Sequence, residues 1–388
     1  MSGQSLLLSL WVVLAMANPM TAQAAVILEP LAFSTIEGWA QDDHAEALQT
    51  FRRSCSEIVA EGQAFGRTVA FGGNREQWIK VCKSAQTATN ARGFFEENFQ
   101  PLKVNDPVRA EGLFTGYYEP EAEGSRTPSK AYPVPLYGNP ADLVAFDGAT
   151  EKRLGLRYGR MIAGKPQPYF TREEIEHGAL AGRGLEIAWL RDWADAFFMQ
   201  IQGSGRVRFT DGTVIRLAYA GKSGQPYTGI GGVLVERGAF TRDQMSMQAT
   251  RTWMAKDEKA ARQLMWENKS FVFFREVELG DPKLGPPGAQ KVPLTPRRSL
   301  AVDRSFWMFG TPVWLDTTTP SGPEAGMEIF RHLMIAQDTG TAIKGHARGD
   351  VFWGAGEQAA LTAGHMKSQG RMIVLLPIDL AHQLTSRP

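Results

Sequence analysis

Two aspartates near the end of the chain, Asp338 and Asp350, bracket a Gly-rich run whose residue types suit acid–base chemistry. The segment from Leu333 to Gly354 reads LMIAQDTGTAIKGHARGDVFWG, and Asp350 stands directly before Val351-Phe352-Trp353. A carboxyl group beside an aromatic wall is desolvated, which raises its pKa and lets it hold a proton near neutral pH. Cleavage of a glycosidic bond requires such a proton donor. The alternative interpretation is a pair of turns, because Asp-Gly and Gly-Asp pairs are common turn residues.

Motifs for other chemistries are absent from the sequence. It contains no HExxH, no CxxC and no paired histidines at metal-ligand spacing among its six histidines, so we expect neither a catalytic metal nor another cofactor. The GxGG run Gly229–Gly232 lacks a P-loop lysine and the distal acid of a dinucleotide site, and no GxSxG elbow occurs. We therefore expect Gly229–Gly232 to form a tight turn.

The elements that must position the two aspartates are mostly short strands. GLFTGYYEP, from Gly112 to Pro120, is an aromatic-rich strand that ends in a turn. The run from Phe197 to Gly221 predicts three strands, one leading into Gly203-Ser204-Gly205 and two joined by a turn at Asp211-Gly212. A further strand begins at Phe271. Many short strands separated by turn residues favour a barrel or sandwich over a doubly wound sheet.

Helix signals are fewer, and two of them involve the cysteines. Apolar residues at helical spacing between His44 and Gly62 include Cys55, and a second helix-like run from Trp78 to Ala85 includes Cys82. Two such helices can pack as an antiparallel hairpin with a structural disulfide, although two buried free thiols are the alternative. Later helices are predicted from the capping signatures Thr171 with Glu174 and Thr241 with Gln244, and over Asp257–Asn268.

The first 24 residues have the pattern of a secretory signal peptide. Ser5 to Met16 is largely apolar, and Ala22-Gln23-Ala24 is a small-residue cleavage site, although no Lys or Arg precedes the apolar run. A buried N-terminal helix is the alternative. No cysteine occurs before Cys55, so we expect no lipoprotein anchor and, after cleavage, no transmembrane segment.

Length and charge limit the remaining possibilities. About 364 residues follow Ala24, which is more than one hydrophobic core usually organises, so two domains are expected. The formal net charge of +1 argues against a nucleic-acid partner and against strong electrostatic adhesion to membranes. Ten tryptophans are compatible with carbohydrate binding, although tryptophan is more often part of a core.

Several separated blocks resemble the MltA family of lytic murein transglycosylases in the order in which that family has them. They are FTGYYEP (Phe114–Pro120), MQIQGSGR (Met199–Arg206), YAGKSGQPYTGIG (Tyr219–Gly231), and LTPRRSLAVD, TPVWLDT and the Asp338–Asp350 run, which are similar to a C-terminal three-aspartate domain. The resemblance implies a mainly β fold with N-terminal helices. It further implies a double-psi β-barrel domain from residues 25–125 and 269–388, with the three-aspartate region at about 295–377, and a β-rich domain inserted at 126–268.

The resemblance also implies a reaction. Family members cleave the β-1,4 bond between N-acetylmuramic acid and N-acetylglucosamine without hydrolysis and leave a 1,6-anhydro ring. By this resemblance Asp350 is the single acid/base and Asp338 a supporting carboxylate, although coupling between the two leaves the inverse assignment open. The implied partner is the glycan strand of peptidoglycan in the periplasm, with a complex of cell-wall enzymes as a further option.

Candidate contacts with the glycan follow from the same motifs. Hydroxyl, amide and aromatic groups in the matched blocks suit sugar recognition, with Lys344 as an alternative salt-bridge partner of an aspartate; the candidates are Thr115, Tyr117, Gln202, Ser204, Tyr227, Lys344 and Trp353. Asp316, the remaining aspartate of the C-terminal region, is expected to be structural, as are Cys55 and Cys82. An inactive glycan-binding module and a polysaccharide hydrolase on the same fold remain the rival functions.

Overall fold

The largest sheet of the protein combines strands from both ends of the chain. A computed structural model describes residues 26–60, 67–106, 110–321 and 326–386, so the expected signal peptide lies outside the described residues. The strand order of this eight-stranded sheet is β1-β2-β17-β14-β15-β13-β16-β3, and β17 also pairs with β3. The strands are β1 (Ile27–Pro30), β2 (Phe99–Asn105), β3 (Gly112–Glu119), β13 (Ser299–Val302), β14 (Pro312–Pro320), β15 (Met327–Asp338), β16 (Arg348–Ala355) and β17 (Lys367–Pro377).

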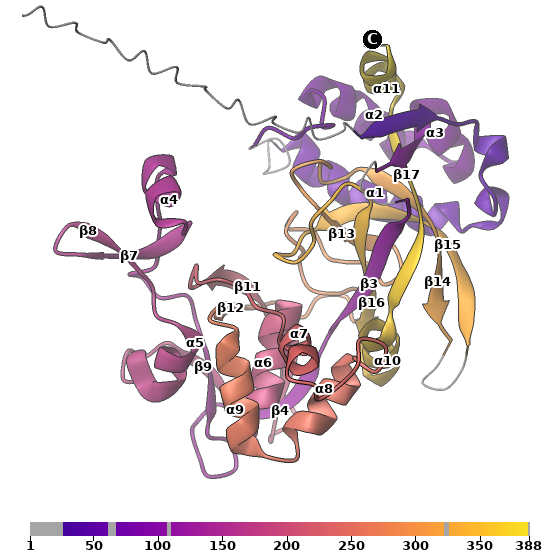
Figure 1. Ribbon diagram of the computed structural model, residues 1–388. Coiled ribbons are helices and arrows are strands. Elements are labelled where there is room, and N and C mark those ends of the chain that lie inside the picture. The colour runs from indigo at the N-terminus through magenta and orange to yellow at the C-terminus, as the bar shows by residue number, and fades with distance from the viewer. Residues whose placement is uncertain (1–25, 61–66, 107–109, 322–325, 387–388) are drawn as a thin grey trace, which may run out of the picture.

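The extra pairing of β17 with β3 makes a closed circuit of six strands. Around the circuit, β13 runs parallel to β15 and β16 runs parallel to β3, while the other pairs are antiparallel. β3 therefore lies between two strands that follow it by more than two hundred residues (Figure 1). Two short helices, α10 (Glu357–His365) and α11 (Ile378–Thr385), flank β17 in the sequence.

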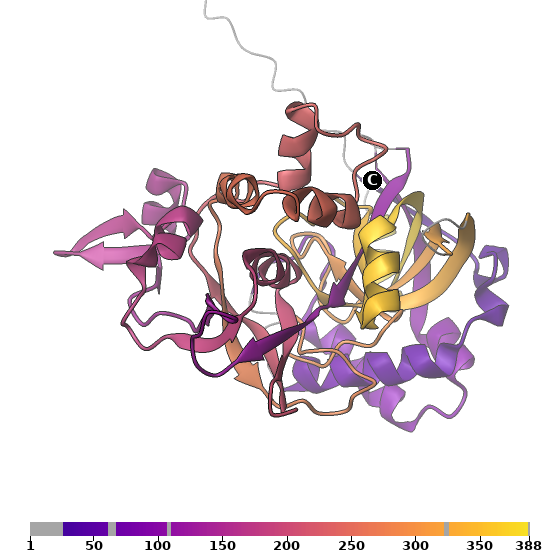
Figure 2. The ribbon, with the colours of Figure 1, turned by 90° about the horizontal axis from the view of Figure 1, so that it is seen from below.

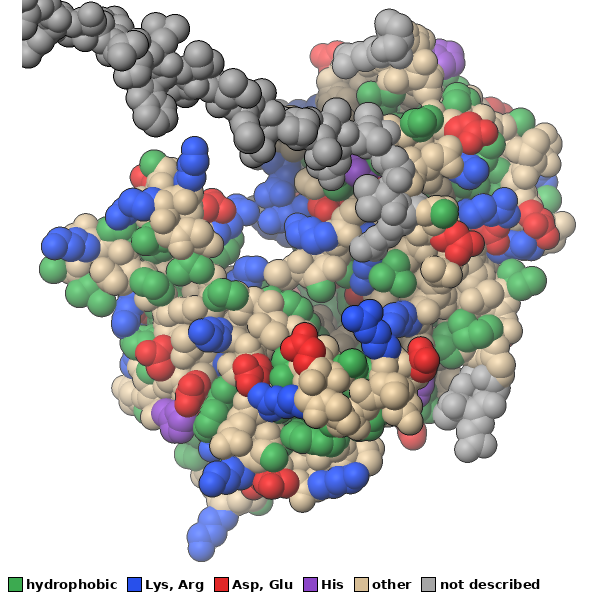
Figure 3. Space-filling model, in the orientation of Figure 1, with side chains coloured by type: hydrophobic (Ala, Val, Ile, Leu, Met, Phe, Trp, Pro, Cys, Tyr) green, Lys and Arg blue, Asp and Glu red, His purple; other side chains and the backbone are tan. Residues whose placement is uncertain are grey.

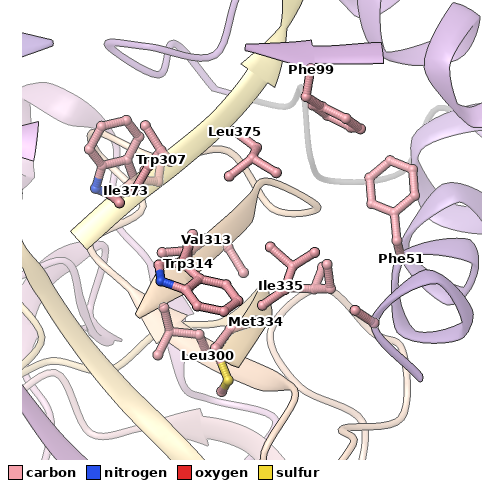
Figure 4. Close-up of a cluster of buried hydrophobic side chains, with 14 of the residues drawn as sticks. Phe51, Phe99, Leu300, Trp307, Val313, Trp314, Met334, Ile335, Ile373 and Leu375 are labelled. Carbon is pink, nitrogen blue, oxygen red and sulfur yellow. The ribbon is translucent and has the colours of Figure 1, made fainter. Parts of the chain in front are cut away.

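The core of this region is apolar on the inner face of the strands. Trp314, Ile335 and Leu375 are fully buried on one face of β14, β15 and β17, and Val313 is fully buried on the other face of β14 (Figure 4). The Trp307 side chain is also buried, and its indole Nε1 donates a hydrogen bond to the backbone oxygen of His346 at 2.7 Å. This bond satisfies the polar atom of the ring, as burial of tryptophan requires.

Helices near the N-terminus cover one side of that core. They are α1 (His44–Val59), α2 (Arg75–Thr87) and α3 (Ala91–Asn98), preceded by the short 3₁₀ turns Phe33–Thr35 and Trp39–Gln41. The side chain of Asp43 caps α1, and Asn74 with Gln77 forms a capping box on α2. Phe51 of α1 and Phe99 of β2 pack edge to face at 5.7 Å, which joins the helices to the sheet (Figure 4).

The two cysteines join α1 to α2. Cys55 and Cys82 form a disulfide with a Cα–Cα distance of 5.4 Å, and both residues are buried. The helical spacing that placed both cysteines on inward faces was therefore a correct basis for pairing them.

The region between β3 and the later strands of the main sheet forms a second sheet with its own core. Its six strands have the order β12-β11-β10-β4-β9-β5. They are β4 (Glu121–Ser125), β5 (Val134–Tyr137), β9 (Glu186–Leu190), β10 (Ser204–Phe209), β11 (Val214–Lys222) and β12 (Val272–Val277). The helix α6 (Trp193–Gln202) packs on the sheet, and α7 (Ile230–Glu236), α8 (Met247–Met254) and α9 (Glu258–Glu267) pack against α6 in a second apolar cluster (Figure 2).

A small third sheet projects from this region. It consists of β6 (Val144–Ala145), β7 (Tyr158–Ile162) and β8 (Lys165–Pro168), with α4 (Gly148–Leu154) between β6 and β7 (Figure 1). Thr171 and Glu174 form the predicted capping box at α5 (Arg172–Glu174), which continues as a π-helical turn, Ile175–Ala179.

Three predicted elements differ in the structure. The GxGG run Gly229–Gly232 is not a tight turn but begins the helix α7, whose N-cap is Gly229. The run before Gly203 is the helix α6 and not a strand, because Asp192 caps its start and Gly203 ends it in the left-handed conformation. Its apolar residues are buried on more than one side, which hides the helical period from a sequence reading. The helix expected at Thr241 begins instead at Met247, capped by Ser246, while Gln244 accepts a hydrogen bond from the Thr241 backbone in a turn.

A buried ion cluster fixes the second sheet to the main one. Glu119, at the end of β3, is fully buried between Arg206 of β10 and Arg216 of β11, with contacts of 2.8 Å and 2.7 Å. Arg216 also donates to the backbone oxygen of Leu284 at 2.9 Å, in the segment that leads back to the main sheet. The two chain crossings between the sheets are thereby tied together.

The predicted mainly β fold with N-terminal helices is confirmed.

Candidate active site

Strand pairing brings the two aspartates of the Gly-rich run to one row of the main sheet. Ala301 of β13 lies opposite Asp338 of β15 on one side and opposite Asp350 of β16 on the other. Thr115 of β3 lies opposite Asp350 and completes the row. Because neighbouring strands are about 4.8 Å apart, the Cα atoms of the two aspartates are separated by about 10 Å. Both side chains are half-buried.

Asp350 is held by one hydroxyl and one nearby cation. Thr115 Oγ1 donates to Asp350 Oδ1 at 2.5 Å, and Arg348 donates to the same Thr115 hydroxyl at 2.7 Å. Among the described residues no donor contacts the second carboxylate oxygen of Asp350, so that oxygen is available to a proton or a ligand.

The surroundings raise the pKa of Asp350 to about 6. Burial is the largest cause, because a desolvated carboxylate loses the water that stabilises its charge. The positive charge of Arg348 and the hydrogen bond from Thr115 oppose this rise, and the negative charge of Asp338 adds to it. The group can therefore hold a proton and release it close to neutral pH.

Asp338 has a different environment. Its Oδ1 accepts hydrogen bonds from the backbone N–H groups of Ala289 and Thr339, both at 2.9 Å, and its Oδ2 accepts from the Tyr117 hydroxyl at 2.9 Å. Burial raises the pKa of Asp338, while these three donors oppose the rise. Donors on both oxygens favour the charged form and leave less room for a proton than Asp350 has.

The aromatic candidates near the aspartates are not open stacking faces. Tyr117 is only 8% exposed, and its ring packs against Phe352 at 5.2 Å, so its hydroxyl and not its ring serves the site. The ring of Trp353 packs against Phe330 at 5.3 Å and contributes to the core. Both rings are used in packing, which disfavours stacking on sugars, and their contact with the glycan stays a prediction.

The remaining candidates come from the second region. Gln202 accepts a hydrogen bond from the Tyr118 backbone at 3.1 Å and lines a cavity of about 170 Å³ together with Gly116, Tyr118, Phe198 and Met247. Ser204 is 6% exposed at the start of β10, and this burial argues against direct contact with a ligand.

Tyr227 lies close enough to Asp350 for the charge of that carboxylate to act on its hydroxyl. The residue is 40% exposed, yet its hydroxyl is surrounded by protein atoms, and this desolvation together with the charge of Asp350 raises its pKa. Tyr227 thus brings the loop after β11 close to Asp350.

Lys344 and Asp316 lie outside the pair of carboxylates. Lys344 is exposed and pairs with neither Asp338 nor Asp350; its charge acts on Asp303, whose pKa is lowered against burial by hydrogen bonds from Ser305 and Gly345 and by Lys344. Asp316 of β14 bonds Arg331 at 2.7 Å and also pairs with Arg371 of β17. These pairs join three neighbouring strands, which suits a structural role.

Comparison with known proteins shows to which family this chain is similar. Residues 113–275 match the MltA specific insert domain, and residues 298–376 match the 3D domain. The structure is similar to the crystal structure of a membrane-bound lytic murein transglycosylase from Agrobacterium tumefaciens, with a TM-score of 0.82 and 33% identity over 92% of this chain and 99% of that one. The chain belongs to the MltA family.

Curated members of the MltA family agree. Membrane-bound lytic murein transglycosylase A of Vibrio cholerae is 38% identical over 264 residues, which cover 67% of this chain and 64% of that protein. The protein of the same name from Escherichia coli K12 is 35% identical over 266 residues, which cover 68% and 65%. The matched part thus spans just under two thirds of these relatives. A structure of E. coli MltA with bound chitohexaose superposes with a TM-score of 0.65 at 28% identity, over 92% of this chain and 93% of that one.

Sequence reasoning about this MltA-family chain missed one member of the site. Arg348 is 8% exposed, and through Thr115 it is linked to the side chain of Asp350. A signal was present, because residues two apart on a strand project from the same face, and Arg348 precedes Asp350 by two. The Gly-rich run predicts a turn, and a turn prediction does not place Arg348 and Asp350 on one face.

Proposed function

We propose that this protein is a lytic transglycosylase that cleaves the β-1,4 bond between N-acetylmuramic acid and N-acetylglucosamine in peptidoglycan. The observation that carries the proposal is the contrast between the two carboxyl groups. Asp350 has a pKa of about 6 and one oxygen without a donor, while Asp338 receives donors on both oxygens. Membership of the MltA family, whose curated relatives are named lytic murein transglycosylases, supports the choice of substrate.

Asp350 acts twice in the proposed reaction. Its proton goes to the glycosidic oxygen as the C1–O bond breaks, and an oxocarbenium-like centre develops at C1. The resulting carboxylate then takes the proton of the O6 hydroxyl of N-acetylmuramic acid, whose oxygen bonds to C1 and closes the 1,6-anhydro ring. Because the substrate supplies the nucleophile, neither a second catalytic carboxylate nor a water molecule is needed, and Asp350 ends the cycle protonated.

Asp338 supports the cycle through its charge. A fixed anion about two strands away opposes ionisation of Asp350 and stabilises positive charge that develops at the sugar ring. Thr115 and Arg348 hold the Asp350 carboxyl in one orientation. The inverse assignment, with Asp338 as the acid, is disfavoured by the three donors on Asp338.

The proposal includes the arrangement of the chain around the site. We infer that the closed circuit of six strands is a double-psi β-barrel built from residues 25–125 and 269–388, with residues 126–268 as an inserted domain. The second sheet extends slightly beyond these bounds, because β4 and β12 belong to it. The parallel pairs in the circuit and the insert-domain match support this inference. The glycan would lie between the two parts, where Tyr227 approaches Asp350 and Gln202 contacts β3.

The proposed location is the periplasm, reached through a signal peptide at residues 1–24. In the described part of the chain no helix combines the length and the apolar character needed to span a membrane. The names of the relatives place those proteins at a membrane.

The decisive experiment is the release of soluble fragments from purified peptidoglycan by the wild type and by Asp350→Asn. The amide keeps the shape but cannot cycle a proton, so the rate should fall by at least about 10⁴-fold. Mass spectrometry of the products should find anhydro ends. A folded Asp350→Asn variant with near wild-type rate would refute the assignment, and reducing ends would mean hydrolysis. Retention of glycan by the wild type without release of fragments would mean a binding module.

A further inference from the structure

Five cationic side chains from separate segments converge beside the candidate active site; we call them the basic cluster. Burial lowers the pKa of Lys222, and the charges of Arg304, Lys344 and Arg157 lower it further. Burial likewise lowers the pKa of Arg304, with the charges of Arg67 and Arg157 adding to the effect. Charges that act on one another in this way lie close together. The cluster consists of Arg67, Arg157, Lys222, Arg304 and Lys344.

No ion pair within the described residues balances the charges of the basic cluster. Within residues 26–60, 67–106, 110–321 and 326–386, none of the five side chains forms an ion pair with a carboxylate. Asp303 acts on Lys344 through space and offsets part of that one charge, so the five side chains together keep a large positive net charge. Since like charges repel and two of the five are half-buried, the arrangement costs stability in the free protein.

The side chains of the cluster come from both the main-sheet region and the second region. Arg157 and Lys222 come from the second region, whereas Arg304 and Lys344 come from the main-sheet region and Arg67 from the segment before α2. Figure 3 shows Lys and Arg side chains around the opening between the part that carries α4 and β7 and the main-sheet region. The hydroxyls of Tyr158 and of the 45% exposed Tyr219 lie near Arg304 and add hydrogen-bond donors.

Two short segments connect the cluster with the two aspartates. Lys222 Nζ donates to Thr341 Oγ1 at 3.1 Å, and Thr341 follows Asp338 by three residues, a chain length of about 10 Å. Tyr227, which approaches Asp350, follows Lys222 by five residues. The cluster is therefore connected to Asp338 and to Tyr227 by short stretches of chain.

We propose that the basic cluster binds the carboxylates of the peptide stems carried by peptidoglycan. This inference rests on the proposed function and specifies its substrate further. The glycan backbone is uncharged while its lactyl carboxyl groups are amide-linked to the stems, so the backbone itself offers five cations nothing to pair with. The stems branch from the lactyl group of N-acetylmuramic acid and end in free carboxylates, for which Arg and Lys are the matching donors. A strand bound at Asp350 would direct a neighbouring stem toward the cluster.

The test compares two forms of one substrate. One is soluble glycan strands with their stems, and the other is the same strands after an amidase has removed the stems and the freed lactyl carboxylates have been converted to amides, so that no anion remains. The variant is Arg157→Gln/Arg304→Gln, which removes one cation from each side of the opening. We expect its kcat/KM on stem-bearing strands to fall by at least about tenfold, chiefly through KM, and its activity on stripped strands to stay at the wild-type level. The preference of the wild type for stem-bearing strands should also shrink as salt rises.

Equal losses on both strands, or no loss on stem-bearing strands, would overturn the inference. Lys256→Gln, an exposed lysine after α8 outside the cluster, is the matched control for loss of positive charge and should change neither substrate. Thermal unfolding checks the fold, and the double variant should melt no lower than the wild type because repulsion is relieved.

Binding separates this inference from the proposed function. Calorimetry with Asp350→Asn measures affinity for both strands without turnover. If the wild type cleaves neither strand, the proposed function fails, yet the two affinities still decide whether the cluster recognises stems. Equal affinity of Asp350→Asn for the two strands would refute stem recognition on its own.

Discussion

At the scale of single residues, the site depends on opposing effects on one carboxyl group. Burial raises the pKa of Asp350 to about 6, Arg348 and Thr115 oppose the rise, and Asp338 adds to it. If protonated Asp350 is the form that donates, activity must decline as the pH rises through about 6. The position of this decline reports the balance among those neighbours.

Two substitutions should move this decline in opposite directions. Thr115→Val removes a hydrogen bond that favours the charged carboxylate, so the pKa of Asp350 should rise and the decline should move to higher pH. Asp338→Asn removes a negative charge that disfavours ionisation, so the decline should move to lower pH. The measurement is the pH dependence of kcat/KM on soluble glycan strands. Shifts of the same sign in both variants would contradict the assignment of Asp350 as the acid.

The raised pKa also predicts a stability effect of Asp350→Asn. The folded state binds this proton more tightly than the unfolded chain, so the stabilisation is complete below the unfolded pKa of 3.8 and is lost as the pH rises through about 6. Above pH 6 the ionised carboxylate of Asp350 lowers the free energy of unfolding by about 1–3 kcal/mol, and the neutral amide of the variant does not. The variant should therefore unfold at a higher temperature than the wild type at pH 7.5, and this difference should vanish near pH 4. An unchanged melting temperature at pH 7.5 would argue against a desolvated Asp350.

At the scale of elements, β3 has two functions. Its Thr115 and Tyr117 hold the two aspartates, and Glu119 at its end is clamped by Arg206 and Arg216 of the second sheet. The strand therefore couples the site to the junction between the two sheets.

Neutralising the clamp should cost much of the stability. Glu119→Gln leaves two buried guanidinium groups without their counter-ion, which should destabilise the fold by about 3 kcal/mol or more. Glu121→Gln, two residues on in an exposed pair with Arg208, is the matched control and should change stability by less than about 0.5 kcal/mol. Denaturant unfolding of both variants makes the comparison, and equal effects would mean that the buried cluster is not a clamp.

The same elements show what a sequence can reveal. Helical spacing placed Cys55 and Cys82 on facing helices, and alternation with turn residues predicted β3 and the hairpin of β10 and β11. Spacing failed for α6, because a helix buried on several sides has no polar stripe. Asp338 and Asp350 were found from local composition, whereas their partners Thr115, Tyr117 and Arg348 are set by strand pairing between distant segments. That pairing leaves no local trace, so only the family resemblance linked β3 to the site.

At the scale of the whole molecule, the disulfide fastens the helical layer to which the main sheet is anchored. The bond spans 27 residues, and a loop of that length stabilises the folded state by about 3–4 kcal/mol through the unfolded chain. Titration of the denatured, unreduced protein should detect no free thiol. Cys55→Ala/Cys82→Ala should lower the melting temperature, and two free thiols in the native preparation would exclude the bridge.

Because β3 pairs with β16 and β17, the candidate site can form only late in the synthesis of the chain. The hydroxyl of Thr115 orients the carboxyl group of Asp350, which is 235 residues later in the sequence, and the strand that closes the circuit ends at Pro377. A chain that ends before Asp350 lacks the acid, and one that ends between Asp350 and β17 lacks a strand that pairs with β3. The proposed activity can therefore arise only when synthesis is almost complete, so prematurely terminated chains should be inactive.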